Sequence, residues 1–198
     1  MEKKLRMLLV VFVVLAVIIP VTASAMTINP QIGINSSILT NDPQNGEHEV
    51  RTGWQVGGYL RLDSKKFYLQ PGLFYHNMGT ELQTNNEITH EKSTFQNQVH
   101  SIQFPLLIGF NVIDGSTFDL RLQAGTCTDF ITGVDHNDHF TKDDLNSTYW
   151  SFKFAVGIDF SVLSVDLGYD LGMSNFYADE RQDDGKMKSV FLNAGVRF

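Results

Sequence analysis

Cysteine is almost absent from this sequence, since Cys127 is the only one among 198 residues. A single thiol cannot close a disulfide within the chain, so covalent cross-linking plays no part in the fold. Cys127 shares the strand phase of Gly125 and is expected to point inward, as a buried and inert thiol with no histidine near it in the sequence. The chain also lacks a linker rich in glycine and proline, which favours one domain.

Long hydrophobic runs are missing except at the N-terminus, where Met7–Ile19 is apolar. A basic stub precedes this run, and the small residues Ala23-Ser24-Ala25 follow it. That order is typical of a secretory signal peptide, and the run is short for a transmembrane helix. We expect cleavage after Ala25, so that residues 1–25 form the signal peptide and residues 26–198 the mature domain. An uncleaved membrane anchor is the alternative.

Basic residues are fewer than acidic ones, 15 against 22, which gives a net charge of −7. The predicted signal segment carries three basic residues and Glu2, so its removal changes the net charge to −9. An acidic exported protein is a poor match for the phosphate backbone of nucleic acids, so we expect no nucleic-acid partner.

What the sequence does contain is alternation, clearest between Trp150 and Leu171. Large apolar side chains fall on every second position up to Phe160 and, after Ser161 and Val162, on every second position again. A period of two predicts β-strands, because successive side chains leave a strand on opposite faces. Two such runs with so short a break predict an antiparallel hairpin.

The length of the hairpin turn decides which charged residues face each other. A two-residue turn sets Lys153 opposite Asp170, whereas a four-residue turn sets Asp159 opposite Asp166. Like charges directly across a strand pair are unfavourable. We therefore predict the two-residue turn, although Ser-Val is a poor sequence for it.

The two faces of this hairpin differ in a way that bears on its surroundings. One face is large and apolar, and the other mixes serine, charged residues and Gly157, Gly168 and Gly172. A soluble sandwich would pack the apolar face on a second sheet, and a membrane barrel would turn it to lipid. The glycines favour the barrel, because a crowded interior needs small residues and a solvated face gains nothing from them.

The same alternation recurs along the mature chain. It predicts eight strands: 27–35, 54–62, 67–76, 101–110, 118–125, 150–160, 163–172 and 189–198. Tight turns follow the second, fourth and sixth strands, and long loops follow the others. The predicted long loops are Asn35–Gly53, Gly79–Asn97, Gly133–Ser147 and Ser174–Lys186. Short turns at one end and long loops at the other predict an all-β, eight-stranded antiparallel up-and-down transmembrane β-barrel, in which the first and last strands meet.

Outward aromatic residues are expected to gather at the two ends of the barrel, as membrane interfaces favour. The predicted belt at the short-turn end consists of Phe67, Phe110, Phe118, Phe160 and Phe198, and that at the long-loop end of Trp54, Tyr75 and Trp150.

Charged residues of both signs are expected inside the barrel. The predicted lumen charge network consists of Arg61, Arg121, Lys153 and Arg197 with Asp119, Asp159, Asp166 and Asp170. Four positive and four negative groups balance, and an unpaired buried charge is costly, so we expect these side chains to pair and close the lumen. An eight-stranded barrel has room only for its own side chains or one small ligand.

The strand sequences resemble those of the PorT-like outer-membrane β-barrel domain. The resemblance rests on FYLQPGLFYHNMG (67–79), SIQFPLLIGFNV (101–112), FDLRLQAG (118–125), VDLGYDLGMSNF (165–176) and VFLNAGVRF (190–198). It covers nearly the whole mature chain and implies a fold and a location in the bacterial outer membrane. It also implies that the terminal strand ending in Phe198 is read by the outer-membrane assembly machinery. The chain departs from the pattern at Gly125-Thr126-Cys127, where a glycine-aromatic pair is usual. The residue at which the fifth strand ends is therefore not predicted.

Two places have residue types that suggest chemistry. Asp135-His136-Asn137-Asp138-His139 contains metal ligands, but too densely spaced for a closed zinc site. Weak calcium binding is the alternative to a solvated acidic loop, and we expect the solvated loop and no cofactor. His76 and His100 flank the second long loop with opposite phases, so no set of serine, histidine and carboxylate is expected at one end of the barrel.

Three functions agree with these observations. The first is a non-enzymatic surface protein whose acidic loops contact a protein partner or stabilise the membrane. The second is an accessory component of a secretion or transport assembly. The third is a barrel that binds a small ligand or modifies lipid, for which no catalytic set is found.

Overall fold

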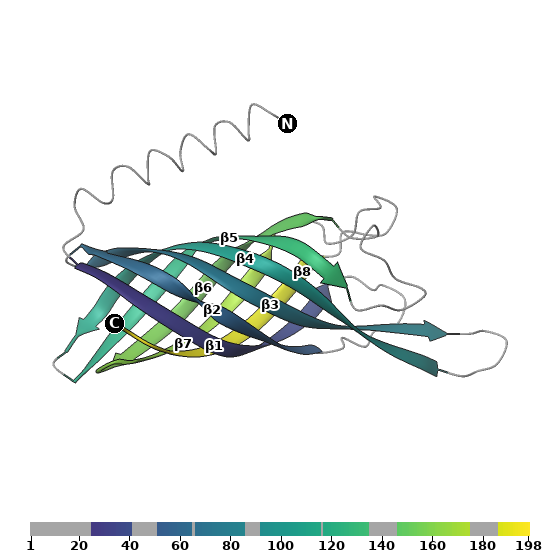
Figure 1. The fold of residues 1–198 in the computed structure, drawn as a ribbon, viewed down its shortest axis with the longest axis horizontal. Helices are drawn as coiled ribbons and strands as arrows, with labels where there is room; N and C mark the ends of the chain where they lie inside the picture. The colour runs from purple at the N-terminus through teal and green to yellow at the C-terminus, as the bar shows by residue number, and fades with distance from the viewer. Residues whose placement is uncertain are drawn as a thin grey trace, which may run out of the picture.

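The eight predicted strands form one closed barrel (Figure 1). The computed structural model describes residues 25–40, 51–64, 66–85, 92–115, 117–134, 146–174 and 186–198, and residues 1–24 of the predicted signal segment 1–25 lie outside them. The strands are β1 (Ala25–Thr40), β2 (Arg51–Ser64), β3 (Phe67–Asn85), β4 (Lys92–Asp114), β5 (Phe118–Val134), β6 (Thr148–Phe160), β7 (Leu163–Gly172) and β8 (Lys186–Val196). Each is antiparallel to its neighbours in chain order, which confirms the predicted up-and-down architecture. The described part of the chain contains no helix with the length and hydrophobicity that crossing a membrane requires.

The barrel closes between its first and last strands. β1 pairs with β2 on one side and with β8 on the other. Beyond the end of β8, Ile28 and Phe198 exchange two backbone hydrogen bonds of 3.0 and 2.9 Å. An even number of alternating strands makes this last pairing antiparallel. The sheet therefore closes on itself. None of the eight described strands is an edge strand, which would expose a row of unpaired N–H and C=O groups.

Strands at the long-loop end extend further than the alternation predicted. The second predicted loop, Gly79–Asn97, is largely paired: β3 and β4 continue side by side from Gly79 opposite Gln98 to Asn85 opposite Lys92. They project past the rim of the barrel (Figure 1). The prediction of a loop here was wrong, because it ended the strands where the apolar face ends. Ladder hydrogen bonds satisfy the backbone without an apolar face.

Smaller corrections apply at the same end. The first predicted loop is shortened, because β1 continues to Thr40 and β2 begins at Arg51. The fifth strand, whose end beyond Gly125 was not predicted, continues to Val134. The third and fourth predicted loops agree with the strand ends within a few residues.

The β6–β7 hairpin has the predicted two-residue turn. Phe160 lies opposite Leu163, and Lys153 lies opposite Asp170. Ser161 adopts a positive φ of 55°, the sign that the favoured two-residue hairpin turns need at their first central position. Serine at this position is uncommon, and the register places the two opposite charges face to face. The argument from charge pairing therefore gave the correct register where the turn sequence alone did not.

Inward glycines make room for large inward side chains on neighbouring strands. A Cβ at Gly72 would collide with the ring of Tyr59, and one at Gly168 would collide with the ring of Phe191. A Cβ at Gly157 would meet the guanidinium of Arg121. The interior of an eight-stranded barrel is narrow, so a bulky side chain needs a glycine beside it. The mixture of small and large residues on the inner face is the outcome of this pairing.

Every strand exposes large apolar side chains on the outer face of the barrel, and a charge introduced among them is expected to be costly. In the middle of β6, Val156→Arg should destabilise the barrel by about 2–4 kcal/mol, because an arginine near the bilayer midplane loses its hydration. Urea titration of the protein folded in lipid vesicles measures this loss, and Leu106→Arg on β4 should behave similarly.

Val156→Leu is the matched control, since it keeps the apolar surface at the same position. Equal stability of Val156→Arg and Val156→Leu would contradict the assigned orientation. A polar substitution at the inward residue Gln103 is not a suitable control, because it would also remove buried hydrogen bonds. The Gln103 side chain is buried and donates to Asp129.

Candidate functional site

Three arginines converge on Asp159 near the short-turn end of the lumen: Arg61 of β2, Arg121 of β5 and Arg197, which directly follows β8. Asp159 Oδ1 accepts a hydrogen bond from Arg121 Nη2 at 2.6 Å. Its Oδ2 accepts from Arg61 at 2.7–2.8 Å and from Arg197 Nη1 at 2.7 Å. The carboxylate of Asp159 is fully enclosed, and Arg121 has no exposed surface. Charge-assisted bonds of this length between buried groups are strong, so Asp159 ties β2, β5 and the C-terminal residues after β8 to β6.

Asp166 and Asp63 complete this group. Asp166 Oδ1 lies 3.0 Å from Arg121 Nη2, and Asp63 Oδ1 lies 3.5 Å from Arg61 Nε. We call the group the turn-side cluster, and its members are Arg61, Arg121, Arg197, Asp63, Asp159 and Asp166. Three positive and three negative charges balance within it. Asp63 was not among the predicted lumen residues, because it was assigned to the turn after the second strand.

Amide side chains extend the turn-side cluster across the lumen. Asp166 Oδ2 accepts from Gln31 at 2.6 Å, and its Oδ1 accepts from Gln123 at 3.1 Å. Ser164 Oγ accepts from Arg121 Nη2 at 2.9 Å and from Asn29 at 3.2 Å. These bonds link β1, β5 and β7, strands that are not all neighbours in the sheet. The network therefore spans the barrel and does not merely line its wall.

Lys153 and Asp170 form the predicted pair closer to the long-loop end. Lys153 Nζ donates to Asp170 Oδ2 at 2.9 Å, and its side chain is 1% exposed. The same ammonium lies 4.0 Å from the centre of the Phe191 ring. A cation above an aromatic face is attracted by the ring quadrupole, so the lysine is held from two sides.

Asp129 is a lumen residue that the sequence reasoning missed. Its fully buried carboxylate accepts from Ser101 Oγ at 3.2 Å and from Gln103 Nε2 at 3.2–3.3 Å, and Cys127 Sγ lies 3.9 Å away. His76 Nδ1 lies 3.6 Å from its Oδ1. We call Lys153, Asp170, Asp129 and His76 the loop-side cluster. Asp129 was missed because the fifth strand was ended before it, although its phase matches that of Cys127.

Asp119 does not belong to the network, contrary to the prediction. Its carboxylate is half-buried and accepts a hydrogen bond from the backbone of Gly115 at 3.2 Å, at the β4–β5 turn. Its cross-strand neighbour is Asp159, whose oxygens are already occupied by arginines. The phase of Asp119 is inward, but its position at the rim lets the side chain reach the turn and water.

A serine, a histidine and a carboxylate do meet inside the barrel, which corrects the expectation that none would. The order of contacts differs from that of a nucleophilic triad, because Ser101 donates to Asp129 and not to His76. A histidine must lie between the two for it to accept the serine proton. Ser101, His76 and Asp129 are also buried, so a substrate has no access to them.

An apolar layer completes the filling of the lumen. Tyr59, Phe74 and Leu107 form a buried cluster, and the rings of Tyr59 and Phe74 lie 4.8 Å apart. These apolar side chains add to the buried charged and amide side chains of the two clusters, so both kinds of side chain occupy the described lumen.

Comparison with known sequences identifies the family. The profile of the outer membrane protein beta-barrel domain family matches residues 23–178. The chain belongs to this family. No curated protein matches the sequence.

Solved structures of other outer-membrane barrels share the fold of this family member. The chain is similar to the outer membrane protein OprG from Pseudomonas aeruginosa, with a TM-score of 0.54 and 12% identity over 89% of this chain and 97% of that one. It is similar to Neisserial surface protein A, with a TM-score of 0.53 and 12% identity over 89% of this chain and 99% of that one. At such low identity these likenesses show the fold alone. The protein is an integral barrel of the bacterial outer membrane.

The aromatic residues predicted to form belts lie outward on this outer-membrane barrel. Phe67 and Phe110 are in contact at the short-turn end, with ring centres 5.1 Å apart. Trp54 and Tyr75 are in contact at the long-loop end, 5.5 Å apart. Phe118, Phe160 and Phe198 at the short-turn end and Trp150 at the long-loop end are exposed. Their role as membrane-interface belts stays a prediction.

The acidic segment Asp135-His136-Asn137-Asp138-His139 lies outside the described residues. Within the part of the chain that the structure describes, no group of three or more histidine, cysteine or acidic side chains could hold a metal ion.

Proposed function

We propose that this outer-membrane barrel is non-enzymatic and has a structural or partner-binding role, with its surface loops as the contact region. The filled lumen is the observation that carries this proposal. Arg121, Phe74, Lys153 and Phe191 are fully buried inside the barrel. Two ionic clusters and an apolar layer oppose the passage of hydrated solutes, so the long-loop end is the part left for contacts. The same filling argues against a small-ligand or lipid-modifying role.

The lack of a wide channel gives the direct test. The purified full-length protein, reconstituted in planar bilayers, is expected to show no large, steady, porin-like current, because side chains occupy the narrow lumen of an eight-stranded barrel. Conductance is recorded before and after addition of a known porin, which shows that the bilayer accepts channels. A stable current of porin size from this protein alone would contradict the proposal.

The projecting ends of β3 and β4 support a partner-binding role at the outer surface. Their backbones stay paired from Gly79–Gln98 to Asn85–Lys92, beyond the barrel. A paired ribbon presents a contact surface at lower entropic cost than an unstructured loop.

A second candidate is an accessory component of a secretion or transport assembly, favoured by the resemblance of the strand sequences to PorT-like barrels. A pull-down from detergent-solubilised envelopes distinguishes the two. Recovery of a multi-protein secretion assembly supports the accessory role, and a single surface partner lost on deletion of 80–97 supports the first.

The signal segment and the C-terminal strand complete the proposal. Cleavage after Ala25 leaves a chain whose Met26 lies opposite Leu62 at the start of the β1–β2 pairing. The mass of the mature protein tests this cleavage site. Phe198 is exposed and outward at the end of the terminal strand, where the outer-membrane assembly machinery would read it. Lower recovery of folded Phe198→Ala barrels from cells, with normal folding of the purified variant in detergent, would support that reading.

A further inference from the structure

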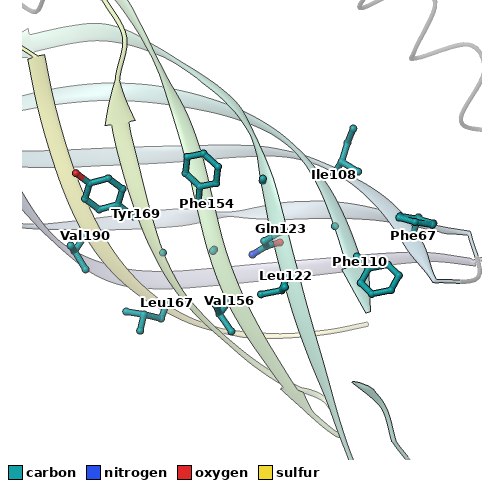
Figure 2. A pocket seen from close by; sticks show the side chains of 14 residues that line it. Phe67, Ile108, Phe110, Leu122, Gln123, Phe154, Val156, Leu167, Tyr169 and Val190 are labelled. Carbon is teal, nitrogen blue, oxygen red and sulfur yellow. The ribbon is translucent and has the colours of Figure 1, made fainter. Parts of the chain in front are cut away.

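The lipid-facing surface of the barrel has a depression that extends from Phe67 of β3 across β4–β7 to Val190 of β8. It has a volume of about 660 Å³ and an almost entirely apolar lining. In Figure 2, Phe67 and Phe110 lie at one end, Tyr169 and Val190 lie at the other, and Phe154 stands between them. This volume is of the order of small-molecule ligand sites, and the depression is open along the outer surface of the barrel.

Ala124 explains why the surface is hollow at this place. Its small outward side chain lies directly across from Ile108 on one strand and from Phe154 on the other. Both neighbours are exposed and rise above it. Ala155 and Gly168, paired with each other and directed inward, add only backbone to the floor. A methyl group and backbone, bordered by aromatic and branched side chains, therefore form the floor of an apolar groove.

Two lysines stand beyond the end of the depression that contains Val190. Lys186, Lys188 and Val190 share the outward phase of β8, whose inward positions alternate with them. Two residues along a strand span about 7 Å, so Lys188 lies within one lipid head-group width of the groove. Across the β7–β8 ladder, Lys188 lies opposite Leu171, and β7 also contributes Tyr169 to the groove.

Lys186 and Lys188 place positive charge on the outer face of a chain whose net charge is negative. Every aspartate whose side chain the structure describes lies either in the lumen or at the short-turn end. Among the described side chains, no aspartate or glutamate therefore lies on the outer face near Lys186 and Lys188. The positive charge on this part of the surface is therefore not neutralised by a described neighbour. Basic side chains beside a membrane attract anionic lipid head groups.

We propose that the depression over Ala124 and the lysine pair form one site for a phosphate-bearing lipid of the surrounding leaflet. The acyl chains lie in the groove lined by Phe154, Tyr169 and Val190, and the head-group phosphate contacts Lys186 and Lys188. The two parts lie in register on β8 and on adjacent strands, as the two ends of an amphiphile require. The site lies on the outer face of the barrel and is distinct from the lumen.

Binding of a defined lipid to the full mature barrel in detergent tests the site. The probes are dimyristoylphosphatidic acid and dimyristoylglycerol, which have the same chains and differ in the phosphate, and binding is measured by native mass spectrometry. The wild type is expected to bind one molecule of phosphatidic acid about thirty-fold more tightly than the glycerolipid, since each basic residue adds to the attraction. Millimolar inorganic phosphate, which has no acyl chain, should not displace it.

Two variants separate the parts of the site. Lys186→Gln with Lys188→Gln should lose the preference for phosphate and keep the binding of dimyristoylglycerol. Ala124→Phe fills the groove with an outward apolar side chain and should weaken the binding of both lipids about ten-fold. Lys66→Gln at the short-turn end and Leu60→Phe on β2, outside the groove, are the matched controls and should bind as the wild type does.

Three outcomes would overturn the proposal. The first is an unchanged preference for phosphate in the double lysine variant, and the second is equal lipid binding by Ala124→Phe and Leu60→Phe. The third is a detergent-stable dimer of the wild type that Ala124→Phe abolishes, because the groove would then belong to a contact between two copies of the chain.

Discussion

Replacing Asp159 with leucine is expected to destabilise the barrel by about 5 kcal/mol, the upper end of the cost of removing one partner from a buried ion pair. The reason is that Asp159 is the shared acceptor of Arg61, Arg121 and Arg197. Without it, three guanidinium groups remain in the lumen with Asp63 and Asp166 as acidic partners, and Arg121 has no exposure to water. The free energy of unfolding is measured by urea titration in detergent or vesicles, with tryptophan fluorescence as the signal.

Asp119→Leu is the matched control, because Asp119 lies opposite Asp159 in the β5–β6 ladder and binds a turn backbone. Its loss should be about 1 kcal/mol, the usual value of a hydrogen bond that water can replace. Similar losses for Asp159→Leu and Asp119→Leu would mean that the turn-side cluster does not hold the barrel together.

The second large effect is expected at the loop-side cluster. Lys153→Met alone should cost about 3–5 kcal/mol, because it leaves Asp170 buried without its cationic partner. Lys153→Met combined with Asp170→Leu should cost less than the single change, since no uncompensated charge then remains at that pair. The predicted coupling energy is about 2 kcal/mol, within the range for residues in contact. Heat-modifiability gels and urea titration compare the three variants.

A matched cycle replaces Lys153→Met by Lys188→Met, the same change on the outward face of β8. Lys188 makes no ion pair with Asp170, because the two side chains leave neighbouring strands on opposite faces of the sheet. Its effects should add to those of Asp170→Leu. Additive losses in the Lys153 cycle as well would show that the 2.9 Å contact contributes no net stability.

Local alternation was enough to predict the strand order, the barrel and most of the residues that face inward. Lys153 and Asp170 were paired correctly because they lie 17 residues apart on one hairpin, where a short turn fixes the register. Asp119 was placed wrongly because phase gives the face of a residue and not its depth along the barrel. Asp129 was missed for a related reason, since its strand continues beyond the last strongly apolar position.

The sequence by itself determined the fold class, the inner and outer faces and the β6–β7 register, because a period of two and a two-residue turn are local properties of the chain. Only the tertiary structure decided that Asp159 gathers Arg61 from 98 residues away, and that Ala124 lies at the floor of a groove. Such contacts depend on the stagger between strands and on the curvature of the closed sheet. Stagger and closure are set jointly by all eight strands, so no single stretch of the sequence records them.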